Sequence, residues 1–160
     1  MIELDAGAAN VNSRLALVIL NASTMRQMEH WRYAIATVIG RIPDCDDVMI
    51  VGAVLSIGSE KLLRANLATE LRNMDNVLPY DRLTACSVAS IAATTDINRE
   101  TVRRRVARMI SDGLLVRDNG SVRLAPGILQ LPVARDVVHR QLGSLQMTVE
   151  RLCRLGIIRL

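Results

Sequence analysis

Apolar residues recur at three- and four-residue steps in the first quarter of the chain, which is the spacing of one face of an α-helix. We therefore expect a long helix from about Asn12 to Arg41, kinked near residues 21–24, that stops before Pro43. Residues 1–10 lack this periodicity and predict a loose lead-in. The apolar positions of the helix include Leu17, Leu20, Met28, Trp31, Ile35, Val38 and Ile39.

Two further segments precede residue 82. The run 48–57 is almost entirely apolar and predicts a buried helix, and the carboxylates of Asp44, Asp46 and Asp47 favour its N-terminus by capping and through the helix dipole. A more polar, amphipathic segment begins near residue 59 and ends around residues 73–76. Its apolar positions are Leu62, Leu63, Leu67 and Leu71.

Between residues 86 and 125 the pattern becomes a series of short elements. Ser87 is a good N-cap for a helix that ends near Thr95. After a tight turn, Asn98 caps a second helix over residues 98–111. The stripe of this helix that faces inward is expected to contain Val102, Val106, Met109 and Ile110.

A hairpin is predicted after the second helix. Gly113 suits the left-handed position that commonly follows a helix. The pair Asn119-Gly120 then separates two strand-like runs, and this pair is the strongest short-range signal for a two-residue hairpin turn. Residues 114–125 therefore predict a β-hairpin.

The last helix is expected from Leu131 or Pro132 to about Leu155. Its apolar positions are spaced by 4, 3, 4 and 3 residues, which is a heptad seam. This seam fits two arrangements, packing on the first long helix of the same chain or forming a two-fold dimer interface. The seam consists of Val138, Leu142, Leu145, Val149 and Leu152.

The composition sharpens this picture. The chain has 160 residues and a mass of 17.6 kDa, which fits one domain or a small module with helical attachments. Half of the residues are apolar, but there is no Phe and only one Trp and two Tyr. A core of aliphatic residues favours helices, and the lack of aromatic residues argues against the stacking platforms that bind single-stranded nucleic acid.

Positive charge is concentrated in the second half of the chain. Residues 1–82 carry 8 basic and 10 acidic groups, whereas residues 83–160 carry 12 basic and 6 acidic groups. All basic residues except Lys61 are arginines. Codon usage can account for the preference for Arg but not for its position, so an anionic partner is expected for the second half.

The order of helix, short turn, helix and hairpin resembles the winged helix-turn-helix module of bacterial transcription regulators of the MarR and GntR kinds. The residues that match in spacing are Ala92, Ile97, Thr101, Val102, Val106, Gly113 and Leu114. Residues 99–106 look like the recognition helix of such regulators. Asp96 stands where these turns usually carry Gly, and Asp tolerates the left-handed conformation better than most residues.

The resemblance covers about 40 of the 160 residues. It implies a mainly α-helical winged helix-turn-helix fold, with long flanking helices and the hairpin as a wing. The segment 59–82 does not fit the layout of MarR-type dimers.

Helix geometry assigns the candidate DNA contacts. The second helix contains five arginines, counting Arg105, and is expected to turn Arg99, Arg103, Arg104 and Arg108 to solvent. Its first turns would reach the bases. Arg can donate two hydrogen bonds to guanine, and Glu can accept one from cytosine. The predicted base contacts are Arg99, Glu100, Arg103 and Arg104. The predicted contacts to the DNA backbone are Ser87, Ser90, Thr101, Arg108, Arg117, Asn119 and Arg123.

The sequence therefore predicts a homodimeric transcription regulator that binds a pseudo-palindromic site in double-stranded DNA. The alternative is a winged-helix adaptor that binds a protein and not DNA. A small apolar effector could be held by Met25, Met28 and Trp31 together with the helix at 48–57, although residues of these types at helical spacing are more often plain core.

The other polar residues predict no further chemistry. Cys45, Cys86 and Cys153 form no CxxC pair, and His30 and His139 are isolated, so neither a metal nor a cofactor is expected. The sequence has no phosphate-binding loop and no nucleophile motif, and we do not expect an enzyme. Without a signal peptide or an apolar run that could span a membrane, a reduced, cytoplasmic bacterial protein is expected.

Four regions summarise this organisation. Residues 1–10 are the lead-in, and residues 11–82 form an N-terminal helical region for dimerisation and effector binding. Residues 83–127 are the DNA-binding module, and residues 128–160 form a C-terminal dimerisation helix.

Overall fold

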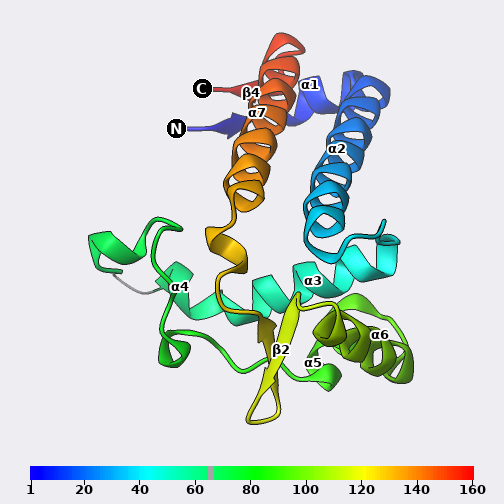
Figure 1. The fold of residues 1–160 in the computed structure, drawn as a ribbon. Coiled ribbons are helices and arrows are strands. Elements are labelled where there is room, and N and C mark those ends of the chain that lie inside the picture. Colours follow the sequence, from blue (N-terminus) through cyan, green and yellow to red (C-terminus); the bar gives the residue numbers. More distant parts are fainter. Residues whose placement is uncertain (65–66) are drawn as a thin grey trace. The chain divides into compact units, whose positions relative to one another are not determined.

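The computed structural model describes residues 1–64 and 67–160, except for the side chain of Leu63, and it is mostly helical (Figure 1). Two small antiparallel sheets of two strands each complete the fold. The chain divides into two compact units. The first unit contains residues 1–31 and 136–160, and the second contains residues 32–135.

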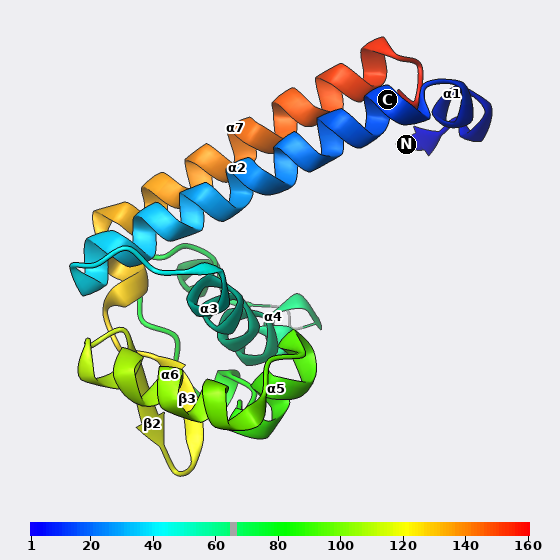
Figure 2. The same ribbon diagram turned by 90° about the vertical axis from the view of Figure 1, so that its right-hand side faces the viewer.

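Two long helices dominate the first unit. The predicted helices are confirmed as α2 (Ser13–Ile39) and α7 (Pro132–Arg154), which run side by side in opposite directions (Figure 2). Polar side chains join them: the hydroxyls of Thr148 and Ser23 lie 2.9 Å apart, and Arg26 Nε donates to Ser144 Oγ at 3.2 Å. The buried side of α7 is therefore partly polar.

The heptad seam does not coincide with this buried side of α7. Val138, Leu142 and Leu145 are 40%, 58% and 53% exposed, Val149 is half-buried, and Leu152 is buried. The side chains that α7 buries are instead Val137, Ser144, Thr148 and Leu152. Most of the seam is consequently unpacked within one chain.

The N-terminal residues are more ordered than the sequence predicts. Strand β1 (Glu3–Leu4) pairs antiparallel with β4 (Ile158–Arg159), and helix α1 (Ala6–Val11) follows. The side chain of Asp5 caps α1 by accepting from the Ala8 amide at 2.9 Å, and it also binds Arg159 at 2.7 Å. The predicted loose lead-in is wrong because its strand partner lies at the other end of the sequence, where periodicity cannot reveal it.

The second unit is built on α3 (Cys45–Gly58), the predicted buried helix. Around it lie α5 (Val88–Thr95), α6 (Arg99–Ser111) and the hairpin of β2 (Leu115–Asp118) and β3 (Ser121–Leu124). The shared core is aliphatic apart from Met109, as the composition predicts. It contains Val48, Ile50, Val51, Ala53, Val54, Ile91, Val102, Val106, Met109, Leu114, Leu115 and Val122.

The predicted amphipathic segment at 59–76 is only partly helical. Helix α4 covers Glu60–Arg64 and a 3-10 turn, η1, covers Thr69–Leu71, while residues 65–66 and the Leu63 side chain lie outside the described residues. Beyond this turn the Asn73 side chain accepts from the Asp75 amide at 2.9 Å. Such local bonds from Asn compete with the helix and favour turns, which limits the helix here. Two more 3-10 turns lie in this unit: η2 (Tyr80–Arg82) before α5 and η3 (Ile128–Gln130) between β3 and α7.

Candidate nucleic-acid interface

The turn between α5 and α6 is fixed by local capping. Ser87 and Ser90 form a capping box at the start of α5, in which each hydroxyl accepts from the other residue's backbone amide, at 3.0 and 2.9 Å. Asp96 ends the helix with φ 56° and ψ 20°, the left-handed conformation expected at this position. Asn98 then caps α6 by accepting from the Glu100 amide at 2.9 Å.

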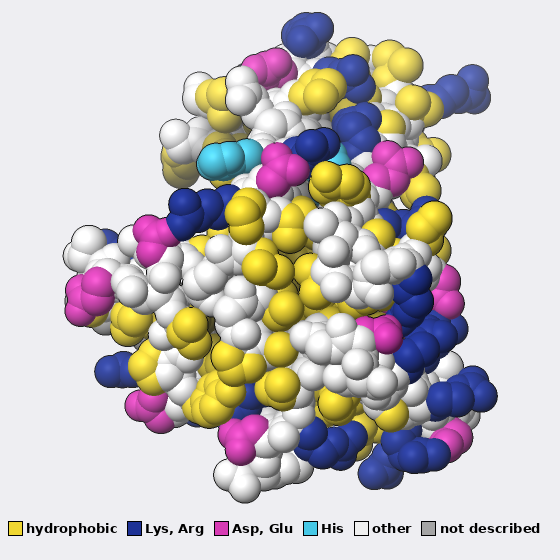
Figure 3. Space-filling view, viewed as in Figure 1, with side chains coloured by type: hydrophobic (Ala, Val, Ile, Leu, Met, Phe, Trp, Pro, Cys, Tyr) yellow, Lys and Arg dark blue, Asp and Glu magenta, His cyan; other side chains and the backbone are white. Residues whose placement is uncertain are grey.

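Helix α6 has one buried face and one basic face. Val102, Val106 and Met109 are fully buried, as predicted, and Ile110 is half-buried. The opposite side exposes the four predicted base-reading residues, Arg99, Glu100, Arg103 and Arg104. In the space-filling view, Lys and Arg side chains gather at the lower right, where Figure 1 draws α6 (Figure 3).

The conformation of the β2–β3 hairpin is set by its turn and by hydrogen bonds to Cys86, which lies shortly before α5. Asn119 and Gly120 have φ values of 47° and 78°, which a two-residue hairpin turn of this kind requires. Cys86 is buried, and its backbone amide donates to Ser121 Oγ at 2.9 Å while its carbonyl accepts from the Val122 amide at 2.6 Å. The hairpin is thus fastened to α5 by hydrogen bonds.

Two of the exposed candidate residues bind each other. Arg103 donates to both carboxylate oxygens of Glu100, at 2.8 and 2.6 Å. These hydrogen bonds lower the pKa of Glu100 and raise the pKa of Arg103. Arg99 and Arg104, in contrast, are exposed and form no ion pair with any residue that the structure describes.

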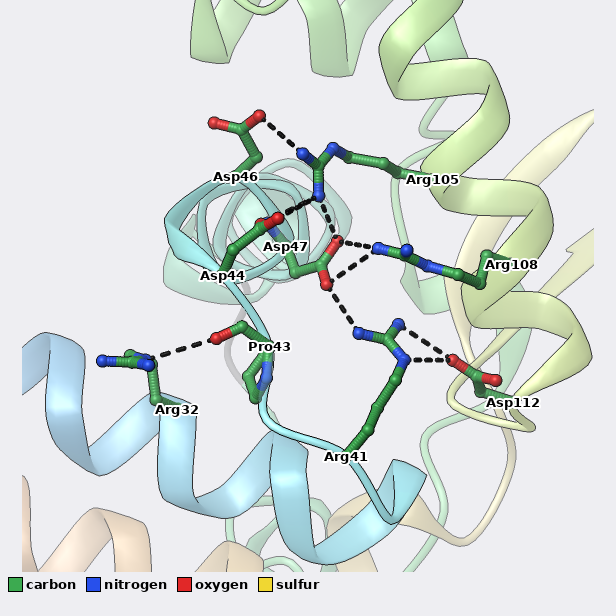
Figure 4. Close-up of polar contacts among 9 residues, drawn as sticks. All are labelled: Arg32, Arg41, Pro43, Asp44, Asp46, Asp47, Arg105, Arg108 and Asp112. Carbon is green, nitrogen blue, oxygen red and sulfur yellow. Dashed lines mark hydrogen bonds and ion pairs between the residues drawn. The ribbon is translucent and has the colours of Figure 1, made fainter.

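The remaining arginines of α6 face a cluster of carboxylates at the start of α3 (Figure 4). Asp47 is completely buried and receives three guanidinium groups, from Arg41 at 2.9 Å, Arg105 at 2.9 Å and Arg108 at 3.0 Å. Arg41 also donates to Asp112 at 2.9 Å, at the end of α6. Helix α6 is therefore tied to α3 by charge as well as by its apolar face.

Among the three arginines of this cluster, Arg105 forms ion pairs with the most carboxylates. Its side chain is 20% exposed and also pairs with Asp44 at 2.7 Å and Asp46 at 3.0 Å. Burial tends to raise the pKa of Asp44, but hydrogen bonds from the Asp47 amide and from Arg105 outweigh it and hold that pKa below its ordinary value. Arg105 therefore faces the carboxylates at the start of α3.

A sequence signal for this cluster exists but is weak. Arg105 and Arg108 are one helical turn apart, and the turn before α3 carries three aspartates within four residues. Helical spacing alone could not decide which arginines find these carboxylates, because the pairing joins residues about 60 positions apart in the chain.

The two arginines of the hairpin differ in their surroundings. Arg117 and Asn119 are exposed. Arg123 is only 14% exposed, its guanidinium lies 4.4 Å from the centre of the Tyr80 ring, and its Nη2 lies 3.6 Å from Asp118. Arg123 therefore faces the body of the second unit, which differs from the predicted contact to the DNA backbone.

The candidate effector residues do not line the cavity that the second unit contains. Met25 is 54% exposed, and Met28 and Trp31 are half-buried. The cavity lies between α3, the loop before α5 and strand β3. An effector at the three residues remains a prediction.

Other kinds of site find little support in the described part of the chain. No group of three or more metal-ligating side chains occurs among residues 1–64 and 67–160. All three cysteines are free; Cys86 is buried, and Cys153 is half-buried. Within the same residues, no helix combines the length and the hydropathy needed to cross a membrane.

Comparison with known proteins adds little. No family model matches the chain, and no curated protein does either. Among solved structures, the chain is similar to Bordetella bronchiseptica BpsR, from a study of how 6-hydroxynicotinic acid regulates the DNA binding of that protein. The likeness covers 85% of this chain and 89% of that one, at 17% identity and a TM-score of 0.38. At this level it carries no argument, and the proposals below rest on the residues alone.

Proposed function

We propose that this chain is a sequence-specific DNA-binding protein of the winged helix-turn-helix type, with α6 in the major groove and the β2–β3 hairpin as the wing. The observation that carries the proposal is the exposure of Arg99 and Arg104 and the lack of an ion pair at either residue among those that the structure describes. Both lie on the first turns of a helix whose other side is buried and ion-paired. The Glu100 carboxylate, which Arg103 holds, acts on Arg104 only at longer range. Arg99 and Arg104 are therefore free to donate to guanine.

The neighbouring residues support this assignment. Glu100 and Arg103 occupy the same face, and their mutual pair can be exchanged for cytosine and guanine contacts. Ser87, Ser90 and Thr101 lie near the N-termini of α5 and α6, where hydroxyls and the positive end of the helix dipole suit phosphates. Arg108, Arg117 and Asn119 are further candidates for the DNA backbone.

We further propose that the protein acts as a homodimeric transcription regulator in the bacterial cytoplasm. The exposed heptad residues of α7 supply the argument, because an apolar seam that is left open within one chain is available to a second copy. Two modules that bind half-sites about one helical turn of DNA apart would select a palindromic sequence.

The decisive experiment selects bound sequences from a random DNA pool with the full chain and then measures affinity by fluorescence anisotropy. Arg104→Ala is expected to weaken binding to the selected sequence about tenfold or more and to reduce its advantage over a scrambled sequence. Arg154→Ala is the matched control, since it removes one exposed arginine from α7. An absence of salt-sensitive binding to any fragment would contradict the proposal and favour the protein-binding adaptor.

A further inference from the structure

The second unit contains a cavity of about 150 Å³, and none of the described residues that line it belongs to α6. Its walls come from the end of α3, from α4, from the loop of residues 73–84, from β3 and from residues 125–130. Most of the lining residues are apolar, and they include Val54, Leu55, Leu62, Val77 and Leu129. In the space-filling view, hydrophobic side chains gather over this region at the lower left and centre (Figure 3).

One cationic side chain lines this aliphatic cavity. Among the lining residues that the structure describes, Arg123 is charged and none is an Asp or Glu. The Nε and Nη1 atoms of Arg123 are shielded from solvent and have no hydrogen-bond acceptor in the protein, and the same is true of the Thr84 hydroxyl. Buried donors of this kind are rarely left without an acceptor, because each costs free energy until one is found.

Arg123 has two neighbours within the protein. The Tyr80 ring lies 4.4 Å from its guanidinium carbon, and Asp118 lies 3.6 Å from Nη2. Because Nε and Nη1 are shielded and lack an acceptor, a bound carboxylate would reach them after a small turn of the guanidinium toward the cavity. An arginine and a hydroxyl at the edge of an aliphatic cavity are the groups that recognise a carboxylate joined to a hydrocarbon body.

We propose that this cavity binds a small aliphatic carboxylic acid, with the carboxylate on Arg123 and Thr84 and the hydrocarbon against the aliphatic wall. A protein cavity of this volume holds a ring of about six carbon atoms. Cyclohexanecarboxylate is therefore a suitable probe. The proposal concerns ligand binding only and does not depend on DNA binding.

The test is isothermal titration of the full chain with cyclohexanecarboxylate and with cyclohexanecarboxamide, its neutral analogue of the same shape. The acid is expected to bind at least tenfold more tightly than the amide, because only the acid offers a charge to Arg123. Equal affinity for the two compounds, or no binding of the acid, would overturn the proposal.

Variants locate the site. Arg123→Gln should weaken the acid about tenfold or more and leave the affinity for the amide unchanged, whereas Arg117→Gln, at the exposed arginine of the same hairpin, should change neither. Leu129→Phe narrows the cavity and should weaken both compounds. Unchanged binding of the acid in Arg123→Gln would refute the site. If a variant fails to fold, the comparison of acid with amide in the unaltered protein decides.

Discussion

Nη1 of Arg105 lies 2.9 Å from Oδ1 of Asp47, a carboxylate with 1% of its side chain exposed. This ion pair joins α6 to the first turn of α3, and Arg41 and Arg108 bind the same carboxylate (Figure 4). A charge buried this completely is stable only with partners that neutralise it. The arginines of α6 are thus divided between those that position the helix and those that remain available to a ligand.

Removal of the buried carboxylate should destabilise the protein. Asp47→Asn replaces the carboxylate that three guanidinium groups share with a neutral amide, and we expect a loss of about 3 kcal/mol in the free energy of unfolding. Urea denaturation followed by circular dichroism measures this loss. Asp46→Asn is the matched control, because Asp46 is 43% exposed and its pair should contribute about 0.5 kcal/mol. Equal losses in the two variants would show that burial does not set the strength of the cluster.

Release of Arg103 from its partner should change the response to DNA. Glu100→Gln removes the carboxylate that holds Arg103 and one negative charge from the proposed interface. We expect anisotropy to show several-fold tighter binding to a scrambled sequence at low salt and a smaller advantage for the selected one.

The same substitution on another surface separates this effect from net charge. Glu150→Gln, on α7, also removes one exposed carboxylate, and it should leave both DNA affinities within about twofold of the unaltered protein. If the two variants behave alike, Glu100 has no role at the interface.

Acid should weaken the attachment of α6 to α3. The pKa of Asp44 is lower in the folded chain than its ordinary value of 3.8, so its contribution to stability is present above that value and is lost as the pH falls through the folded pKa. Unfolding measured between about pH 6 and pH 3 should therefore show stability falling at the acid end. Asp44→Asn should have a flatter acid limb, and a limb as steep as that of the unaltered protein would contradict the assignment.

Disruption of the exposed seam should prevent dimerisation without unfolding the chain. Leu142 is 58% exposed within one chain, so Leu142→Glu should leave the helical circular dichroism signal unchanged while it places a charge in the proposed interface. Light scattering after size exclusion should then give the mass of one chain instead of two. His139→Glu adds a carboxylate at an exposed position off the seam, and should stay dimeric. The proposed interface would be contradicted if Leu142→Glu stayed dimeric like the control variant, or if the unaltered protein were monomeric.

The local elements of the second unit were predictable because their signals are local. Ser87, Asn98 and Gly113 mark helix boundaries through hydrogen bonds and backbone angles that involve only near neighbours, and Asn119-Gly120 specifies its turn in the same way. The inward stripe of α6 follows from its 3.6-residue period. Each of these features appears in the structure where the sequence places it.

Long-range pairing was beyond the sequence. The pairing of β1 with β4 joins the two ends of the chain, and periodicity carries no information about it. The heptad pattern identifies apolar positions, but it does not tell whether they pack on α2. That depends on two contacts between the helices, of Arg26 with Ser144 and of Ser23 with Thr148. Polar contacts between α2 and α7, which are far apart in the sequence, form the side of α7 that packs on α2, and the apolar seam does not.

Local signals in the sequence are enough to specify a mainly helical chain with a capped helix, a turn, an arginine-rich helix and a hairpin, because propensity, capping and periodicity act over a few residues. The role of each arginine depends on tertiary contacts. Arg105 meets three aspartates at the N-terminus of α3, Arg123 lies against Tyr80 beside a cavity, and Arg99 and Arg104 remain exposed. Arginine side chains are long and chemically identical, so only the groups that the fold places within their reach distinguish them.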